Sequence, residues 1–434
     1  MSNILFENLF ISVGIDVGAD FSWMSIALPN QTFVGKPFKL LHSDLNSLSL
    51  AVSKIKEAEE LYSLESRTFL ESTGIYHFPL FCYLVDCGFN ASIINPIITH
   101  STKNGNIRKV KNDKIDSKGI AKLGLSKDIP VSQFPAKLVL ELRSLTRKYY
   151  DLTDERSAHI NKLKGDLHTV FPQYLDVFCD VTGKTSTMIL RQYGTPDKIL
   201  RGHKKTMIEK ISKASRKGLA KASERYEKLC AAANAAKTFG CQIDSIYFNI
   251  FLTLDLVEKL DSALDSILNR IRQLITFNKN EKFIQQIKLL NTIPGVGFLT
   301  AVTIMCEIGD FSAFRNPKQL FAYFGLDPEV NESGKFVGTQ LHMSKRGSRI
   351  ARRAIFAVAL ASIRTKRNGE GINPYLRKYY ELKSGQKPKM VAIGAVMHKV
   401  CNIVFAVLRD EKAFELRSPE EHCKQYQRPA LAAA

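Results

Sequence analysis

Apolar and polar residues alternate along the first part of the chain in a way that is typical of short strands separated by helices. Two apolar runs, SVGIDVG and FSWMSIAL, fall within residues 12–28, and a third run, TFVGKPFKL, follows at 32–40. These runs predict three antiparallel strands. The spacing then predicts a helix at 45–61, a strand at 68–72, a helix at 76–85, a strand at 91–96 and a helix at 113–125. Strands that alternate with helices indicate an α/β domain.

The middle of the chain has a helical period instead. Apolar residues at helical spacing run over 135–170, where Phe171-Pro172 ends the pattern, and the same period returns over 245–277. We expect these two helices to form an antiparallel coiled-coil stalk, with residues 173–240 inserted at its tip. Residues 201–228 of this insertion hold ten Lys/Arg and three Glu, a net charge of +7.

The last part of the chain is predicted to be mainly α-helical. Helices are expected at 281–292, 298–308, 317–324, 347–366, 373–383 and 389–408. The segment IPGVG at 293–297 resembles the turn of a helix-hairpin-helix element, whose backbone N–H groups can bind phosphate; a turn without a ligand is an equal alternative. The expected domains are 1–130, the stalk at 131–280 and a third at 281–410, followed by a tail at 411–434.

Charge indicates the class of partner. The 434 residues include 62 Lys+Arg and 42 Asp+Glu, a formal net charge of +20. Such an excess indicates a polyanion as the partner. Hydrophobic residues make up 45% of the chain, which excludes disorder as the overall description.

Location follows from what the sequence lacks. Residues 1–10 lack the basic segment, the apolar core and the cleavage site of a secretory signal, so we expect a cytoplasmic protein. The longest apolar stretch, 390–408, is interrupted by His398 and Lys399, which predicts a buried helix and no membrane span. Eight scattered cysteines lack zinc-ligand spacing and are expected to be reduced thiols.

Four acids stand out by their positions. Asp16 and Glu71 each lie at the end of a predicted strand, and Asp113 and Asp116 lie three residues apart at the start of a predicted helix. Carboxylates that converge at one edge of an α/β sheet suit two Mg²⁺ ions, for which Mn²⁺ can substitute, beside a phosphodiester. The alternative for each acid alone is a helix cap or a strand end without function.

The order strand-Asp, strand-Glu, helix Asp-x-x-Asp resembles a RuvC-like domain of the RNase H class. The flanking segments ESTGIY (71–76), INP (94–96) and KNDKIDS (111–117) resemble the N-terminal domain of transposases of the insertion sequence 110 family. In the C-terminal part, four further segments follow the second domain of that family in order: PGVG (294–297), FGL (324–326), ESG (332–334) and SKRG (344–347). The resemblance covers about residues 10–172 and 281–408 and weakens over 173–240.

This resemblance implies a prokaryotic DNA transposase that cuts and rejoins DNA through a serine-phosphodiester intermediate. Ser333 matches the family's nucleophile, and Asp16, Glu71, Asp113 and Asp116 match its metal-binding acids, which join the serine in a composite site. The expected partners are double-stranded DNA, a structured noncoding (bridge) RNA that guides site choice, and further copies of the chain in a dimer or a tetramer.

Basic residues near these motifs are candidates for contact with nucleic-acid phosphates. Residues 335–378 contain eleven Lys/Arg and one acid, and Arg349, Arg352 and Arg353 share one helical face. Ser344 competes with Ser333 as nucleophile, although a phosphate contact suits it better. The expected contacts are Lys103, Arg108, Lys109, Lys111, Lys335, Ser344, Lys345, Arg346, Arg349, Arg352 and Arg353.

Three other functions are weighed against the transposase. A RuvC-like junction nuclease would use the acids with water and would not need Ser333. An actin-like ATPase or sugar kinase would use GIDVG at 14–18 as a phosphate loop, but the sequence shows no second glycine-rich phosphate loop. A non-enzymatic nucleic-acid scaffold would have lost its acids, and all four are present.

Overall fold

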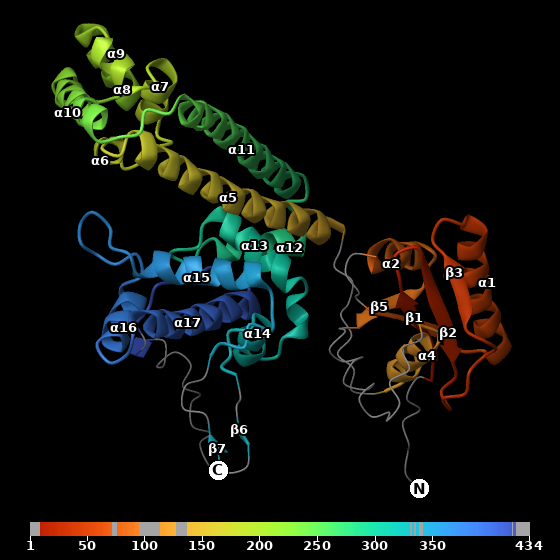
Figure 1. Cartoon of the computed structure of the whole chain (residues 1–434). Helices are drawn as coiled ribbons and strands as arrows, with labels where there is room; N and C mark the ends of the chain where they lie inside the picture. Colours follow the sequence, from red (N-terminus) through yellow and green to blue (C-terminus); the bar gives the residue numbers. More distant parts are fainter. Residues whose placement is uncertain are drawn as a thin grey trace, which may run out of the picture. The chain divides into compact units, whose positions relative to one another are not determined.

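The computed structural model describes residues 9–71, 76–94, 113–126, 137–329, 332–333, 336–337, 342–418 and 420–421, with backbone only at 332–333 and 336–337. Contacts divide the chain into two compact units, Met1–Ala136 and Lys137–Ala434. The first unit is a mixed α/β domain, whereas the second is almost entirely helical (Figure 1). The two units are therefore considered one at a time.

The N-terminal unit is built on a five-stranded sheet in the order β3-β2-β1-β4-β5. Its strands are β1 (Ile11–Val17), β2 (Phe21–Ala27), β3 (Phe38–Leu41), β4 (Ser66–Glu71) and β5 (Asn90–Ile94). β2 runs antiparallel to both β1 and β3, while β1, β4 and β5 are parallel. β1 is the middle strand, and its apolar residues are buried, as expected for a strand covered on both faces.

The third strand begins later than the sequence predicts. Gly35 has a φ of +71°, and Pro37 has no N–H for a strand ladder, so the extended pairing starts only at Phe38. Of the residues before it, Phe33 forms an isolated bridge with Ala27. The predicted strand at 32–40 is thus shortened by its own turn residues.

Helices cover both faces of this sheet. α1 (Leu45–Tyr62) and α2 (His77–Asp86) pack on the face that carries Val13 and Ile15. α4 (Asp113–Gly124) lies on the opposite face, where Ile120 packs with Phe69 and Ile94. The strand alternation therefore separates a large apolar core from a thinner layer under α4.

Two helices of equal length form the stalk of the second unit. α5 (Lys137–Val170) and α11 (Asp244–Phe277) run side by side in opposite directions (Figure 1). Arg156 and Asp261 form an ion pair between them. At the far end, the Tyr247 hydroxyl donates to the carbonyl oxygen of Val170 at 3.3 Å, which joins the start of α11 to the end of α5.

The lysine-rich insertion is a folded helical subdomain at this far end. Its helices are α6 (Tyr174–Val177), α7 (Lys184–Gln192), α8 (Pro196–Arg201), α9 (Lys204–Ser215) and α10 (Leu219–Thr238). They enclose a core that includes Phe171, Tyr174 and Leu229 together with Leu167 of α5. We call residues 171–243 the stalk tip. Its basic residues lie on a subdomain with its own apolar core.

The C-terminal helices surround a second large core. They are α12 (Lys282–Leu290), α13 (Phe298–Ile308), the short 3-10 helix η1 (Phe311–Ala313), α14 (Pro317–Tyr323), α15 (Arg349–Ile363), α16 (Pro374–Ser384) and α17 (Lys389–Asp410). Leu142 of α5 and Ile271 of α11 also enter this core, so the near end of the stalk packs against these helices.

Local sequence explains where several of these helices begin. α14 and α16 each start with an asparagine, Asn316 or Asn373, whose side chain accepts a backbone N–H of the first turn, and a proline follows it. Ser348 caps α15 in the same way by accepting from the Ala351 amide. These caps fix the helix starts close to the predicted positions.

α17 is the apolar helix at 389–410. It is the one helix of the described residues that is long and apolar enough to cross a membrane. The most apolar 18-residue stretch of this helix is 56% buried in the structure. Val400, Val404 and Phe405 lie in the C-terminal core. This packing agrees with the prediction of a buried helix.

Candidate functional site

Asp16 and Glu71 lie next to each other at the edge of the sheet. β1 and β4 are parallel, and Ile15 is paired with Leu70, so the next residue on each strand is one of these two acids. Neighbouring strands are about 5 Å apart. Side-chain alternation places both acids on the face that α4 covers, together with Gly14 and Phe69.

Gly14 lets α4 lie directly on β1. A Cβ atom added at Gly14 would lie 2.1 Å from the Ala121 backbone nitrogen and 2.5 Å from the Ser117 carbonyl oxygen. The hydroxyls of Ser117 and Ser25 form a hydrogen bond of 2.8 Å, which ties the helix to β2 as well. Small residues on both surfaces therefore fix the position of α4 on the sheet.

The first turn of α4 reaches the same edge as Asp16. In the β1–β2 register Asp16 is opposite Trp23, and the Lys114 ammonium lies 4.6 Å from the centre of the Trp23 ring. Lys114 is next to Asp113, and Asp116 follows in the same turn. The backbone thus brings all four predicted acids to one edge of the sheet.

These acids are not clustered around a common point. Among the described residues, no three His, Cys, Asp or Glu side chains form a group that could hold a metal ion. Asp113 is exposed and Asp116 is partly buried, whereas Glu71 is only 7% exposed. The fold therefore fixes the backbone positions of the four acids, and ion binding would need their side chains to turn toward one another.

Glu71 provides the test of whether a cation fits this edge. Its Oε2 atom is buried and has no hydrogen-bond partner among the residues that the structure describes. A buried carboxylate oxygen without a partner is costly, and a cation beside it would compensate for the lost water. The donor set contains only carboxylate oxygens, which hard ions such as Mg²⁺ prefer. The residues present therefore fit a divalent cation.

Ser333 is carried on a hairpin of the second unit. β6 (Glu332–Ser333) pairs with β7 (Phe336–Val337) in an antiparallel register that sets Ser333 opposite Phe336 (Figure 1). The base of the hairpin is held by backbone hydrogen bonds: Glu329 N to His342 O at 2.7 Å and Ser344 N to Asp327 O at 2.8 Å. Ser333 thus lies on a projecting loop with an anchored base.

Ser344 has a structural partner. Its hydroxyl donates to Oδ1 of Asp327 at 2.6 Å. Gly347 also lies against the end of α14, since an added Cβ there would be 1.9 Å from the Tyr323 carbonyl oxygen. The SKRG segment is therefore part of the hairpin base, with Lys345 and Arg346 exposed beside it.

The three arginines of α15 have different environments. Arg352 donates to the carbonyl oxygens of Phe324 and Gly347, at 3.1 and 2.6 Å, and burial lowers its pKa. Arg353 pairs with Asp154 of α5. Arg349 reaches the same carboxylate, but its side chain is 79% exposed. Arg352 thus holds the hairpin base, and Arg349 is the one of the three best exposed to a phosphate.

Five of the predicted site residues lie outside the described residues. They are Lys103, Arg108, Lys109, Lys111 and Lys335.

An ion pair with a buried carboxylate joins α5 to α13, and sequence reasoning missed it. Arg147 donates two hydrogen bonds of 2.9 Å to Glu307, which is 3% exposed. Burial alone would raise the pKa of Glu307, but the hydrogen bonds and charge of Arg147 outweigh it and lower that pKa. The available signal was a single acid inside the apolar helix FLTAVTIMCEI.

The IPGVG turn packs against α15. Gly295 has a φ of +95°, and an added Cβ would lie 2.6 Å from the Ser362 hydroxyl, which itself donates to the Pro294 carbonyl oxygen at 3.0 Å. Gly297 begins α13 without a side-chain cap and is exposed. The glycines of this turn therefore have a packing role that is independent of any ligand.

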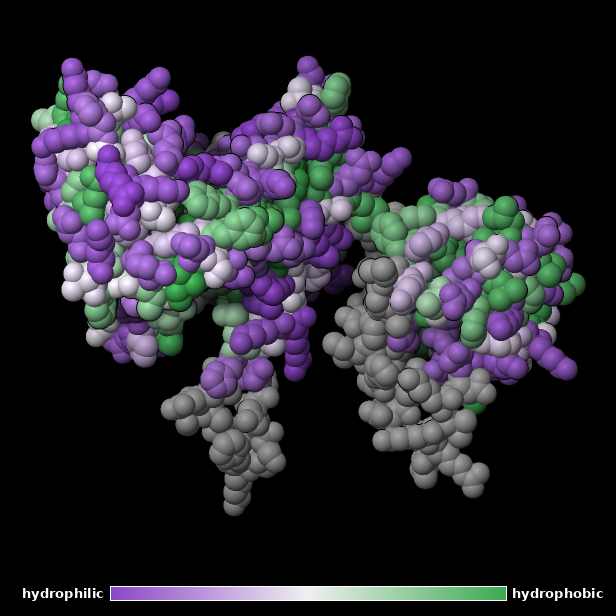
Figure 2. Space-filling view, turned by 45° about the horizontal axis from the view of Figure 1, so that its top comes forward, coloured by the Kyte–Doolittle hydropathy of each residue, from purple (hydrophilic) through white to green (hydrophobic). Residues whose placement is uncertain are grey.

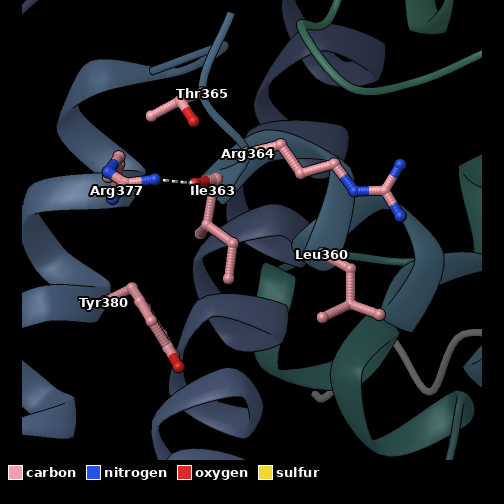
Figure 3. Close-up of a pocket in the computed structure, with 6 residues that line it drawn as sticks. All are labelled: Leu360, Ile363, Arg364, Thr365, Arg377 and Tyr380. Atoms are coloured by element: carbon pink, nitrogen blue, oxygen red, sulfur yellow. Dashed lines mark hydrogen bonds between the residues drawn. The ribbon is translucent and has the colours of Figure 1, made fainter. Parts of the chain in front are cut away.

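A cavity of about 430 Å³ lies between the end of α15 and α16 (Figure 3). Arg377 crosses from α16 and donates to the Ile363 carbonyl oxygen at 2.9 Å, while Arg364 extends away from it. The cavity is lined by Leu360, Ile363, Arg364, Thr365, Arg377 and Tyr380. None of these is a predicted site residue, so the cavity is separate from the candidate site.

Comparison with known proteins identifies both parts of the chain. A model of a DEDD transposase domain, described as a transposase, matches residues 13–172. A second model, described as the transposase IS116/IS110/IS902 family, matches residues 287–381. The two matched segments together make up more than half of the chain.

Curated relatives extend these matches. A 44.8 kDa protein of insertion element IS116 from Streptomyces clavuligerus is 23% identical over 412 residues, which are 94% of this chain and 97% of that protein. A 43.6 kDa protein of IS110 from Streptomyces coelicolor is 23% identical over 286 residues, 65% of this chain and 66% of that protein. The pilin gene-inverting protein of Moraxella bovis is 30% identical over 177 residues, 41% of this chain and 52% of its own length. With both family models matched in chain order, the chain belongs to the IS110 family of insertion-sequence transposases.

Proposed function

We propose that this transposase cuts and rejoins DNA through a covalent bond between Ser333 and a DNA phosphate. The observation that carries the proposal is the position of Ser333 on a projecting hairpin whose base is held by main-chain hydrogen bonds. A nucleophile must reach a phosphorus atom inside a bulky polyanion. A projecting loop with a fixed base permits this approach while limiting the movement of the hydroxyl.

The exchange conserves phosphodiester bonds. The Ser333 oxygen bonds to phosphorus, the bond from phosphorus to one deoxyribose oxygen breaks, and the hydroxyl proton passes to that leaving oxygen by way of solvent or a base. The hydroxyl of a second DNA end then attacks the same phosphorus and releases the serine. Because each step exchanges one ester for another, rejoining needs no nucleotide cofactor.

The acids Asp16, Glu71, Asp113 and Asp116 would hold Mg²⁺, for which Mn²⁺ can substitute. Bound Mg²⁺ would supply positive charge to the phosphoryl oxygens and ease deprotonation of the attacking hydroxyl. In the protein itself, β1 and β4 present two of the carboxylates side by side, and α4 holds the other two at the same edge. This arrangement supports a RuvC-like role for the N-terminal unit.

We further propose that a structured noncoding RNA selects the DNA sites and that the protein acts in the cytoplasm as a homo-oligomer. The net charge of +20 supports a nucleic-acid partner, and base pairing would supply the sequence choice. The stalk supports self-association, because Phe248, Leu252 and Leu256 of α11 are 62%, 46% and 44% exposed and follow each other at four-residue spacing.

The test is a search for DNA attached to the protein. The transposase is purified from cells that also carry its flanking noncoding DNA, incubated with element-end DNA and Mg²⁺, and denatured. A protease-sensitive adduct is expected in the wild type and is expected to disappear in Ser333→Ala and Asp116→Ala. Ser344→Ala is the matched control, since it removes the competing hydroxyl from the hairpin base.

Two outcomes would contradict the serine mechanism. An adduct that persists in Ser333→Ala and disappears in Ser344→Ala would assign the nucleophile to Ser344. DNA cleavage without any adduct, unaffected by Ser333→Ala, would identify a nuclease that uses water and the N-terminal acids.

A further inference from the structure

The turn between α9 and α10 carries exposed positive charge. Four exposed cations, Lys213, Arg216, Lys217 and Lys221, lie within nine residues of each other in this turn and the adjoining helix ends. None of the four forms an ion pair within the described part of the chain. We call these four residues the tip cations.

Several other cations of the stalk tip form ion pairs. Arg191 contacts Asp255 and Glu258, Lys228 pairs with Glu224, and Lys237 pairs with Asp197. Of the acids in these pairs, Glu224 and Asp197 belong to the tip, whereas Asp255 and Glu258 belong to α11. Residues 201–228 carry a net charge of +7, and four of their ten Lys/Arg lie at the α9–α10 turn.

The backbone of the turn is fixed before any partner binds. The Ser212 hydroxyl donates to the Lys217 carbonyl oxygen at 2.7 Å, and Arg216 ends α9 with a φ of +54°. The turn stands on helices whose inner faces, including Met207, Ile211 and Ala222, are buried in the tip core. The tip cations are thus presented on a rigid support, which reduces the entropy lost on binding.

The chemistry of the surface suits a phosphate backbone and not unpaired bases. Proteins that hold single strands offer exposed aromatic rings for stacking. Here the nearby rings of Phe178 and Tyr226 are buried, and cations lie over them. The face of the molecule around α9 and α10 is largely hydrophilic (Figure 2). A duplex, with its bases stacked inside and its phosphates outside, is the polyanion that fits.

The length of the stalk indicates that the tip contacts DNA that flanks the exchange site. Arg147 marks the contact of α5 with α13, and Leu167 marks the start of the tip core. The helical rise between them corresponds to about 30 Å, close to one turn of B-form DNA. The tip core thus begins about one turn of DNA from the contact of the stalk with α13, so a duplex held at the hairpin reaches the tip only through a flank that continues beyond the exchange site.

We propose that the tip cations bind the phosphate backbone of double-stranded DNA that flanks the exchange site. The contact does not read sequence, and its role is to hold the flanking duplex along the stalk. It depends only on DNA being the substrate, and it is independent of which residue is the nucleophile.

The experiment compares two duplex lengths in the absence of Mg²⁺. The variant K213Q/R216Q/K217Q/K221Q and the wild type are titrated with a duplex of about 60 base pairs and one of about 10 base pairs centred on the exchange site, over a range of salt concentrations. The short duplex extends only about half a turn to each side of that site. The matched control K228Q/K237Q removes two tip cations that are already paired. Far-UV circular dichroism and thermal melting check that each variant is folded.

The quadruple variant is expected to bind the long duplex about tenfold more weakly, with a salt slope smaller by about one per lost phosphate contact. Binding of the short duplex and adduct formation on it stay at the wild-type level, so failure of the serine mechanism would be seen separately. Ala220→Glu adds an acid to the same surface and leaves all four tip cations in place. It is also expected to weaken binding of the long duplex.

Unchanged long-duplex binding in both variants would overturn the proposal. Loss of affinity for the structured RNA alone, with DNA affinity intact, would overturn it as well and would assign the tip to the RNA. Equal weakening of the short and long duplexes would show that the tip does not act on flanking DNA.

Discussion

Arg147 of α5 and Glu307 of α13 form a two-point ion pair in which the carboxylate is buried and the guanidinium is half exposed. Nearby, Arg143 donates to the Cys306 carbonyl oxygen at 2.7 Å, and the Tyr323 hydroxyl donates to the Glu307 carbonyl oxygen at 3.2 Å. Tyr323 directly precedes the segment from which the hairpin leaves the helical core. The pair therefore connects the stalk to the base of the loop that carries Ser333.

Replacing Arg147 by Met is expected to destabilise the second unit by about 3 kcal/mol, because the buried carboxylate of Glu307 then keeps only its weaker interactions with Ser348 and Arg143. Chemical denaturation measures this free energy. Lys228→Gln breaks an exposed pair within α10 and is expected to change the free energy of unfolding very little. Equal effects of the two substitutions would show that the Arg147 pair is no stronger than a surface pair.

The same pair predicts how stability depends on pH. The pKa of Glu307 in the folded protein is lowered, so its ion pair contributes in full above the ordinary glutamate pKa of about 4.3. The contribution is lost as the pH falls through the lower folded pKa, because the unfolded chain then binds the proton more readily. The free energy of unfolding of the wild type should therefore fall more steeply below about pH 5 than that of Glu307→Gln. Parallel curves would contradict this assignment.

Gly14 offers a test of how the acids are positioned. Gly14→Ala places a Cβ atom inside the backbone of α4 and should displace that helix, at a cost of about 1–3 kcal/mol or more. Because α4 carries Asp113 and Asp116, DNA cleavage should be lost together with this stability. Gly119→Ala is the control on the same helix. Its added Cβ meets no atom of the described residues within 4 Å, and the substitution should stabilise α4 by about 1 kcal/mol. Cleavage at the wild-type level in Gly14→Ala would separate the activity from the docking of α4.

Periodicity predicted most of the helices and strands because their apolar faces are regular. The predicted helix at 298–308 has the bounds of α13, and the stalk helices begin and end within two residues of the predicted 135–170 and 245–277. The third strand was predicted to begin at residue 32, but it begins at Phe38. The prediction followed the apolar residues of 32–40 and neglected Gly35 and Pro37, which favour a turn. Regular burial is visible in a sequence, whereas a local break within an apolar run is easily overlooked.

Side-chain roles were harder to predict than elements. Arg352 and Ser344 were expected to contact nucleic acid, yet the structure gives them partners in the hairpin base. A cation in a basic segment looks the same in sequence whether it binds a phosphate or a carbonyl oxygen. The partner of Glu307 lies 160 positions away in the chain, so no local pattern could have indicated that pair.

The exposed apolar stripe on α11 predicts how copies of the chain associate. Phe248 and Leu252 are exposed on the stalk, and a charge at either position would be costly to bury against a second copy. F248K/L252K is therefore expected to reduce the mass measured by light scattering from that of an oligomer to that of a monomer, without changing the far-UV circular dichroism. Asn249→Lys adds a charge to a neighbouring exposed position of the same helix and should leave the mass unchanged. If the wild type is already monomeric, or if the double variant keeps the wild-type mass, this stripe does not join copies of the chain.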